Sequence, residues 1–108
     1  MYSPARAGEA AVVGVEATRI SPGVWRFDVT VRHADEGWDH YADRWEVIGP
    51  GGAVLATRVL LHPHVGEQPF SRSLSRVALP DGVPRVTVRA HDSVHGYGGE
   101  VATVDVPD

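Results

Sequence analysis

The sequence predicts an all-β domain, a seven-stranded antiparallel β-sandwich, and three observations carry that prediction. Apolar and polar residues alternate in short runs along most of the chain, and a period of two is typical of half-buried strands. Turn sequences rich in glycine and proline separate these runs at regular spacing, as in sandwich domains. No segment keeps the 3.6-residue period of an amphipathic helix, so we expect almost no helix.

The first three predicted strands contain the bulkiest side chains. Residues 11–20 are rich in valine, the most abundant residue of the chain. Residues 23–33 show the clearest alternation, with large apolar side chains on one face and charged or hydroxyl side chains on the other. Residues 40–48 place three large side chains on one face, and these are Tyr41, Trp45 and Val47.

The last four predicted strands complete the two layers. Residues 53–61 follow the third strand through the turn Gly49–Gly52, and residues 71–79, 85–91 and 100–106 follow in turn. The alternation assigns one set of residues to the core: Trp25, Phe27, Val29, Val31, Trp45, Val86 and Val88.

Length and composition limit the function classes. A chain of 108 residues is the size of one domain, and we expect a flexible tail over residues 1–9 and a single domain over residues 10–108. The net charge of −4 argues against nucleic acid as a partner. No apolar run reaches the roughly 20 residues of a membrane helix. Cysteine is absent, which excludes disulfides and thiolate metal sites. The oligomeric state stays open.

Aromatic residues in the second strand, together with Trp45 in the third, give a pattern that resembles the immunoglobulin and fibronectin type III superfamily. The missing cysteine pair argues against a true immunoglobulin domain. At the level of motifs, the segments 33–47, 60–70 and 91–99 resemble a family of small, mostly uncharacterised bacterial proteins. That resemblance implies export to the periplasm or the exterior, and it implies no particular activity.

The histidines are predicted to gather at one end of the domain. If successive strands run in alternating directions, the loops after the second, fourth and sixth strands share one end. These loops and the strand ends that they join carry all six histidines, whereas plain turn sequences occupy the other end. Long loops on a rigid scaffold are common places for binding residues.

Imidazole donors without thiolates suit a divalent transition metal such as Cu(II) or Zn(II). The leading hypothesis is therefore a non-enzymatic domain that binds such an ion for carriage, delivery or sensing. The expected ligands are His62, His64, His91 and His95, with His40 as a further one. Asp92, Asp39 or Glu67 would orient an imidazole from behind.

The rival interpretation of the same histidines is that they bond loop backbone and carboxylates and bind no metal. His33 in particular shares the phase of the core residues before it, and we expect it to be a satisfied histidine at the edge of the core. For Asp92 we also expect hydrogen bonds to the local backbone of its glycine-rich turn.

Two further functions use the same loops. The loops could form a protein- or peptide-recognition surface, with Trp38, Tyr41 and Tyr97 as anchors, because aromatic residues dominate binding hot spots. Metal-dependent hydrolysis would need an open coordination position and a general base such as Glu36 or Glu67. No catalytic residue is assigned from the sequence.

Overall fold

The structure, a computed structural model, describes residues 9–33 and 37–107. The expected tail over residues 1–9 falls almost wholly outside this range, and so does Glu36. Seven strands form the described part: β1 (Ala11–Ser21), β2 (Val24–Arg32), β3 (Ala42–Ile48), β4 (Val54–Val59), β5 (Phe70–Ala78), β6 (Arg85–Asp92) and β7 (Ala102–Asp105). Each boundary lies within two residues of the predicted one. The described residues contain one helical turn, η2 (Pro50–Gly52), between β3 and β4.

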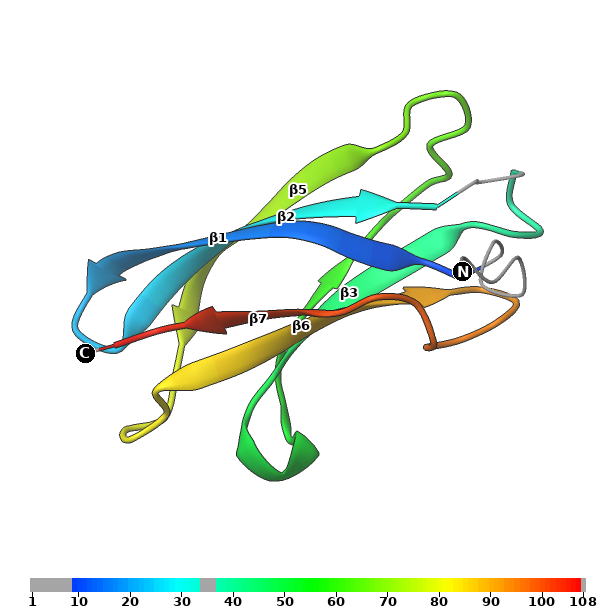
Figure 1. The fold of residues 1–108 in the computed structure, drawn as a ribbon. Helices are drawn as coiled ribbons and strands as arrows, with labels where there is room; N and C mark the ends of the chain where they lie inside the picture. The colour runs from blue at the N-terminus through cyan, green and yellow to red at the C-terminus, as the bar shows by residue number, and fades with distance from the viewer. Residues whose placement is uncertain (1–8, 34–36, 108) are drawn as a thin grey trace.

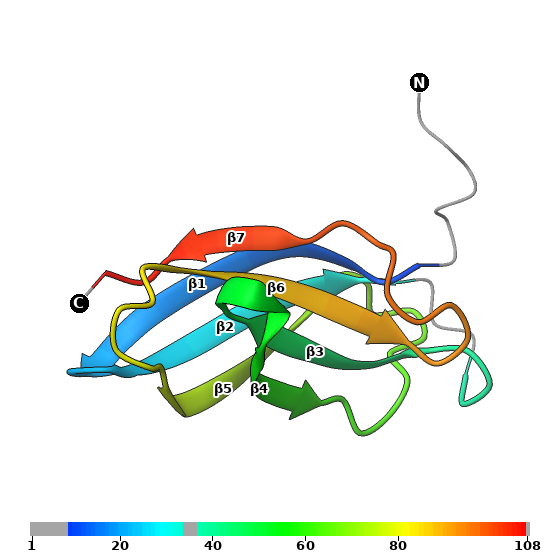
Figure 2. The same ribbon diagram turned by 90° about the horizontal axis from the view of Figure 1, so that it is seen from below.

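The strands form two antiparallel sheets, one with the order β1-β2-β5 and the other with the order β4-β3-β6-β7. Figures 1 and 2 show them as two layers. Both layers contribute to one apolar cluster, which confirms the all-β class and is consistent with a β-sandwich. The domain-wide core exists because the inward side chains of each strand repeat every second residue.

All seven side chains predicted for the core are buried. Trp25, Phe27, Val29 and Val31 come from β2, Trp45 from β3, and Val86 and Val88 from β6. None of them exposes more than 6% of its surface. Burying a side chain of this size stabilises the fold by about 1.5–3 kcal/mol.

A β-bulge in β3 changes the predicted face of one residue. Ala42 pairs with Asp92 and Arg44 pairs with His91, so Asp43 is an extra residue between two neighbouring pairs. An extra residue reverses the alternation. Ala42 is therefore fully buried together with Trp45, whereas Tyr41 is half-buried. The prediction that Tyr41 shares a face with Trp45 and Val47 was wrong for this reason.

The three long loops lie at one end of the molecule, on the right in Figure 1. They connect β2 to β3, β4 to β5 and β6 to β7. The short connections between β1 and β2, β3 and β4, and β5 and β6 lie toward the other end. Gln68 links two of the long loops, because it accepts a hydrogen bond from the backbone N–H of His33 (2.9 Å) and donates one to the carbonyl of His64 (3.1 Å). The predicted common end for these loops is confirmed.

Candidate metal site

A single buried carboxylate, Asp92, organises the end where the loops meet. It is the last residue of β6, and it follows Val86, Val88 and Ala90 on the inward face. Its side chain is fully buried. The Oδ1 atom accepts hydrogen bonds from the backbone N–H groups of Val94 (2.6 Å) and His95 (2.7 Å). The expected bonding of Asp92 to its local backbone is therefore confirmed.

The second carboxylate oxygen, Oδ2, has three imidazoles around it. The Nε2 atoms of His33 and His40 lie 2.8 Å and 3.0 Å from it, and the Nδ1 atom of His95 lies 3.1 Å from it. The rings also touch one another. The His33 and His40 centroids are 4.8 Å apart, as are those of His40 and His95. We call His33, His40, His95 and Asp92 the histidine–aspartate cluster.

The Asp92 carboxylate is held in its charged form. Burial by itself would raise its pKa, but the amide groups of His95 and Val94 and the side chains of His95 and His40 outweigh burial. The net effect holds the pKa of Asp92 well below its usual range. A cation site requires a fixed negative charge of this kind. Without an ion, three imidazole N–H groups would donate hydrogen bonds to the same charged carboxylate.

Different parts of the fold bring the three histidines to Asp92. His33 continues the inward alternation of β2 and is as buried as the core, at 2% exposed. His40 precedes Ala42, the residue that the bulge turns inward. His95 lies in the turn after β6, which mutual backbone hydrogen bonds between Asp92 and Gly96 close (both 3.0 Å). Gly96 has a φ of 71°, which glycine adopts without strain.

Three members of the cluster, His33, His40 and Asp92, have the spacing of a metal site. One ligand atom each from His33, His40 and Asp92 lies within 4.8 Å of the others. In a tetrahedral zinc site with bonds near 2.05 Å, neighbouring ligand atoms are about 3.3 Å apart. The nitrogen–oxygen distances of 2.8–3.1 Å in the cluster are slightly shorter. The ligand atoms of His33, His40 and Asp92 are therefore close enough to surround one ion after small side-chain shifts, whereas the His95 ring, which lies outside this group of three, would have to turn further toward the ion.

His62 and His64 lie in the β4–β5 loop, with ring centroids 4.7 Å apart. The His64 ring stacks on Phe70, with centroids 3.9 Å apart, and its Nε2 atom accepts a hydrogen bond from Arg72 (2.7 Å). This bond uses the lone pair that an ion would need and places a guanidinium beside it. Exposed His62 contacts the carbonyl of Pro63 through Nδ1 (3.2 Å). Glu67 of the same loop is exposed.

His91 lies on the outer face of β6, away from Asp92. Its Nδ1 atom is 2.6 Å from Oδ1 of Asp43, the extra residue of the bulge. The ring also packs edge-on against Tyr97, with centroids 4.8 Å apart. Of the five histidines expected to be ligands, the structure places His40 and His95 around Asp92 and gives the other three different neighbours.

Tyr97 fixes the β6–β7 loop to the outer face of its sheet. Its hydroxyl donates to Oε1 of the buried Glu46 (3.0 Å) and accepts from Arg44 (2.9 Å), while the Arg89 guanidinium lies 3.9 Å from the ring centroid. Burial by itself would raise the pKa of Glu46. Hydrogen bonds and charge from Arg89, Tyr97 and Arg44 lower the pKa by more than burial raises it, so the net pKa is lowered. Tyr97 is therefore held by this network.

Trp38 differs from Tyr97, because 66% of its surface is exposed. It contacts Tyr41 edge-on, with centroids 5.5 Å apart. Asp39, beside it, is also exposed. Of the three residues expected to anchor a partner, Trp38 is the most exposed, whereas 39% of the surface of Tyr97 is exposed and Tyr41 is half-buried.

Sequence reasoning missed the combination of His33 and Asp92. His33 was assigned to the core edge and Asp92 to an orienting role behind the ligands. One sequence signal could have found them. Each is a polar residue that continues the inward alternation at the end of a core strand, and an inward polar residue needs a buried partner.

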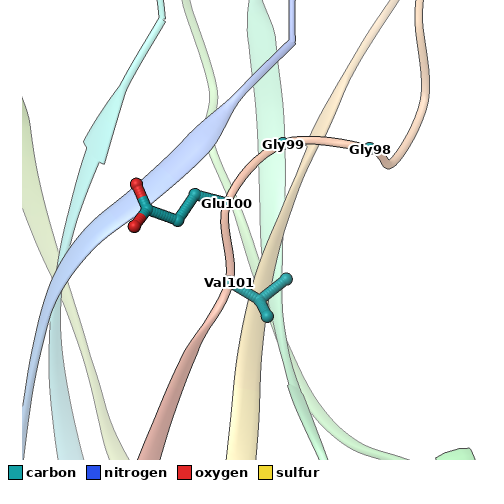
Figure 3. Close-up of a pocket in the computed structure, with 4 residues that line it drawn as sticks. All are labelled: Gly98, Gly99, Glu100 and Val101. Atoms are coloured by element: carbon teal, nitrogen blue, oxygen red, sulfur yellow. The ribbon is translucent and has the colours of Figure 1, made fainter. Parts of the chain in front are cut away.

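A shallow hollow lies apart from the cluster and is lined by Gly98, Gly99, Glu100 and Val101 (Figure 3). Here the β6–β7 loop crosses the start of β1, and Val12 N–H donates to the Glu100 carbonyl (2.8 Å). A Cβ at Gly99 would overlap the carbonyl of Ala10. The hollow contains no histidine, and its glycines serve this close crossing.

Comparison with known proteins adds one relative. A protein named "Putative lipoprotein" from Halomicrobium mukohataei is 43% identical over 97 residues, which make up 90% of this chain and 47% of that protein. The chain thus spans about half the length of the relative it matches. No family model and no solved structure matches the chain. The described residues include no helix with the length and apolar character needed to cross a membrane.

Proposed function

We propose that this chain is a non-enzymatic binding domain that holds one divalent transition metal ion, Cu(II) or Zn(II), in the histidine–aspartate cluster. The observation that carries the proposal is the convergence of three imidazole nitrogens on one oxygen of a buried, charged carboxylate. Three imidazoles and a carboxylate are a ligand set that both ions accept. This set replaces His62, His64 and His91 of the expected ligands with His33 and Asp92.

The hydrogen bonds that the Asp92 side chain accepts from the backbone of Val94 and His95 support a binding role without catalysis. Two amide groups fix Oδ1, so Oδ2 keeps a constant direction toward the imidazoles. If the His95 ring turns toward an ion held by His33, His40 and Asp92, four protein ligands would fill a tetrahedral coordination sphere, as in closed sites, whereas catalytic zinc keeps a position open for water. The cluster is therefore better suited to carriage, delivery or sensing of the ion than to hydrolysis.

The fold type and the location are parts of the same proposal. The sheet orders β1-β2-β5 and β4-β3-β6-β7 favour the immunoglobulin or fibronectin type III class that the aromatic pattern resembles. The name of the relative favours export of this chain as well. A periplasmic or secreted domain would bind metal ions outside the cytoplasm.

Calorimetric titration with Zn(II) and Cu(II) at pH 7.5 tests the proposal. Wild-type protein should bind one ion, His40→Ala should weaken binding by at least tenfold, and Asp92→Asn should do the same while it keeps the shape of the side chain. His62→Ala is the matched control, because it removes an exposed histidine outside the cluster. A flat wild-type titration would refute metal binding, and loss of binding in His62→Ala would move the site to the β4–β5 loop.

A second candidate function is recognition of a protein partner by the loop tips. The four most exposed large apolar side chains of the described residues all belong to the three long loops: Leu61 (73%), Trp38 (66%), Val65 (60%) and Val94 (58%). Exposed apolar groups at a shared end are typical of an interaction site. Peptides selected from a random library on wild-type protein should lose affinity for Trp38→Ser. Selection that yields no such peptides would argue against this function.

A further inference from the structure

The four members of the histidine–aspartate cluster differ strongly in their access to solvent. The side chains of His33 and Asp92 are completely buried, and that of His40 is 15% exposed. The side chain of His95 is 44% exposed. An ion in the cluster would therefore be closed off by the core on one side and covered by His95 on the other.

His95 is also the member whose side chain is most easily withdrawn. Its ring has the longest of the three contacts with Oδ2, at 3.1 Å. Its backbone N–H, not its ring, is what binds Oδ1, so the turn keeps its shape when the ring rotates away. Exposed side chains change rotamer within picoseconds to nanoseconds. His33, by contrast, directly follows β2 and is buried, with only 2% of its surface exposed.

We propose that His95 is the replaceable ligand of the site, through which the ion enters and leaves, and that an external imidazole takes its place during transfer. This inference rests on the proposed function. The position suits a planar ring, because the outgoing His95 ring lies against the His40 ring, with centroids 4.8 Å apart and planes 60° apart. The exchange substitutes one neutral nitrogen donor for another, so the charge of the site is unchanged. His33, His40 and Asp92 hold the ion throughout.

The surroundings of His95 fit a donor supplied by a protein. Val94, the preceding residue, is 58% exposed, and Trp38, two residues before His40, is 66% exposed. Exposed apolar side chains are thus close in sequence to both ligands. A histidine on the surface of a partner could reach the ion while the surrounding apolar groups of the partner contact these two side chains.

Cobalt-loaded protein provides the test, because Co(II) shifts the NMR signals of the imidazoles that bind it. Wild-type protein should show three shifted imidazoles. Addition of deuterated imidazole should remove one set of signals while the ion stays bound, and that set should be the one missing in His95→Ala. His95→Ala itself should still bind one Co(II), and imidazole should restore its wild-type visible spectrum. His62→Ala should behave as wild type.

The outcomes separate the two proposals. If wild-type protein shows no shifted imidazoles, the proposed function fails and this inference fails with it. If three imidazoles are shifted but imidazole removes the signals of His33 or His40, or releases the ion without a mixed complex, only the inference is overturned. A tripeptide Leu-His-Leu should displace His95 at a concentration at least tenfold lower than free imidazole if the donor is a protein. Equal concentrations would assign the donor to a small molecule.

Discussion

The Nε2 atom of His33 lies 2.8 Å from the Oδ2 atom of Asp92. His33 follows β2 of one sheet and Asp92 ends β6 of the other, so this contact joins the two sheets at their common end. Both residues continue the inward alternation of their strands. The cluster therefore closes the core, and any change to it should affect the stability of the domain as well as binding.

Replacement of Asp92 by alanine should lower the free energy of unfolding by about 3 kcal/mol. The carboxylate contacts two backbone amides and three imidazoles. Its removal would leave these buried donors without an acceptor. Urea denaturation measures the change. Asp105→Ala is the control, since Asp105 forms an exposed ion pair with Arg85 (2.8 Å), and such pairs contribute about 0–1 kcal/mol. Equal losses in both variants would contradict the central role of Asp92.

Metal binding should raise the thermal stability, because the ion would connect ligands from both sheets. At a free Zn(II) concentration of one hundred times the dissociation constant, linkage predicts about 2.7 kcal/mol. For a domain of this size that corresponds to a rise in Tm of about 10–20 °C. Differential scanning fluorimetry should show the rise in wild-type protein, its reversal by EDTA, and a rise of no more than about half that size in His40→Ala, whose binding is at least tenfold weaker. A rise of the same size in His40→Ala would point to a different site.

Glu46 should make the stability depend on acid pH. Burial of Glu46 opposes the shift, but hydrogen bonds and charge from Arg89, Tyr97 and Arg44 outweigh it, so the pKa in the folded protein is lowered from its ordinary value of 4.5. A lowered folded-state pKa means that the stabilisation is present above about 4.5 and is lost as the pH falls below that value toward the folded-state pKa.

Urea denaturation between pH 7 and pH 3 checks this sign. The unfolding free energy of wild-type protein should fall below pH 4.5, and the fall should be smaller in Glu46→Gln, in which the titrating group is gone. Asp92 acts in the same direction, so part of the fall should remain. A steeper fall in Glu46→Gln would contradict the prediction.

Gly99→Ala should destabilise the domain by about 1–3 kcal/mol, the usual cost of overpacking, because the new Cβ would overlap the carbonyl of Ala10. Gly14→Ala is a matched control on the strand that the loop crosses. There the new Cβ would meet Thr30 at 3.6 Å, an ordinary contact, and alanine should be neutral or slightly stabilising in a strand. Thermal denaturation of the two variants measures both effects.

The sequence by itself determined the seven strands, the inward residues of β2 and β6, and the common end of the three long loops. These features follow from local rules, since the pleat alternates side chains and turn residues fix where each strand stops. It also indicated that His33 lies at the edge of the core, as its 2% exposure confirms.

Only the tertiary structure decided which histidines meet which carboxylate. His33 and Asp92 belong to different sheets and become neighbours through packing of the two layers, which no periodicity within one strand can specify. The bulge at Asp43 reverses the alternation before Trp45, so Ala42 is buried and His40 faces Asp92, although a regular strand would point it away. His64 likewise has its Nε2 lone pair directed to Arg72 by stacking on Phe70. Alternation places a side chain on a face, but contacts across the sandwich select its partner.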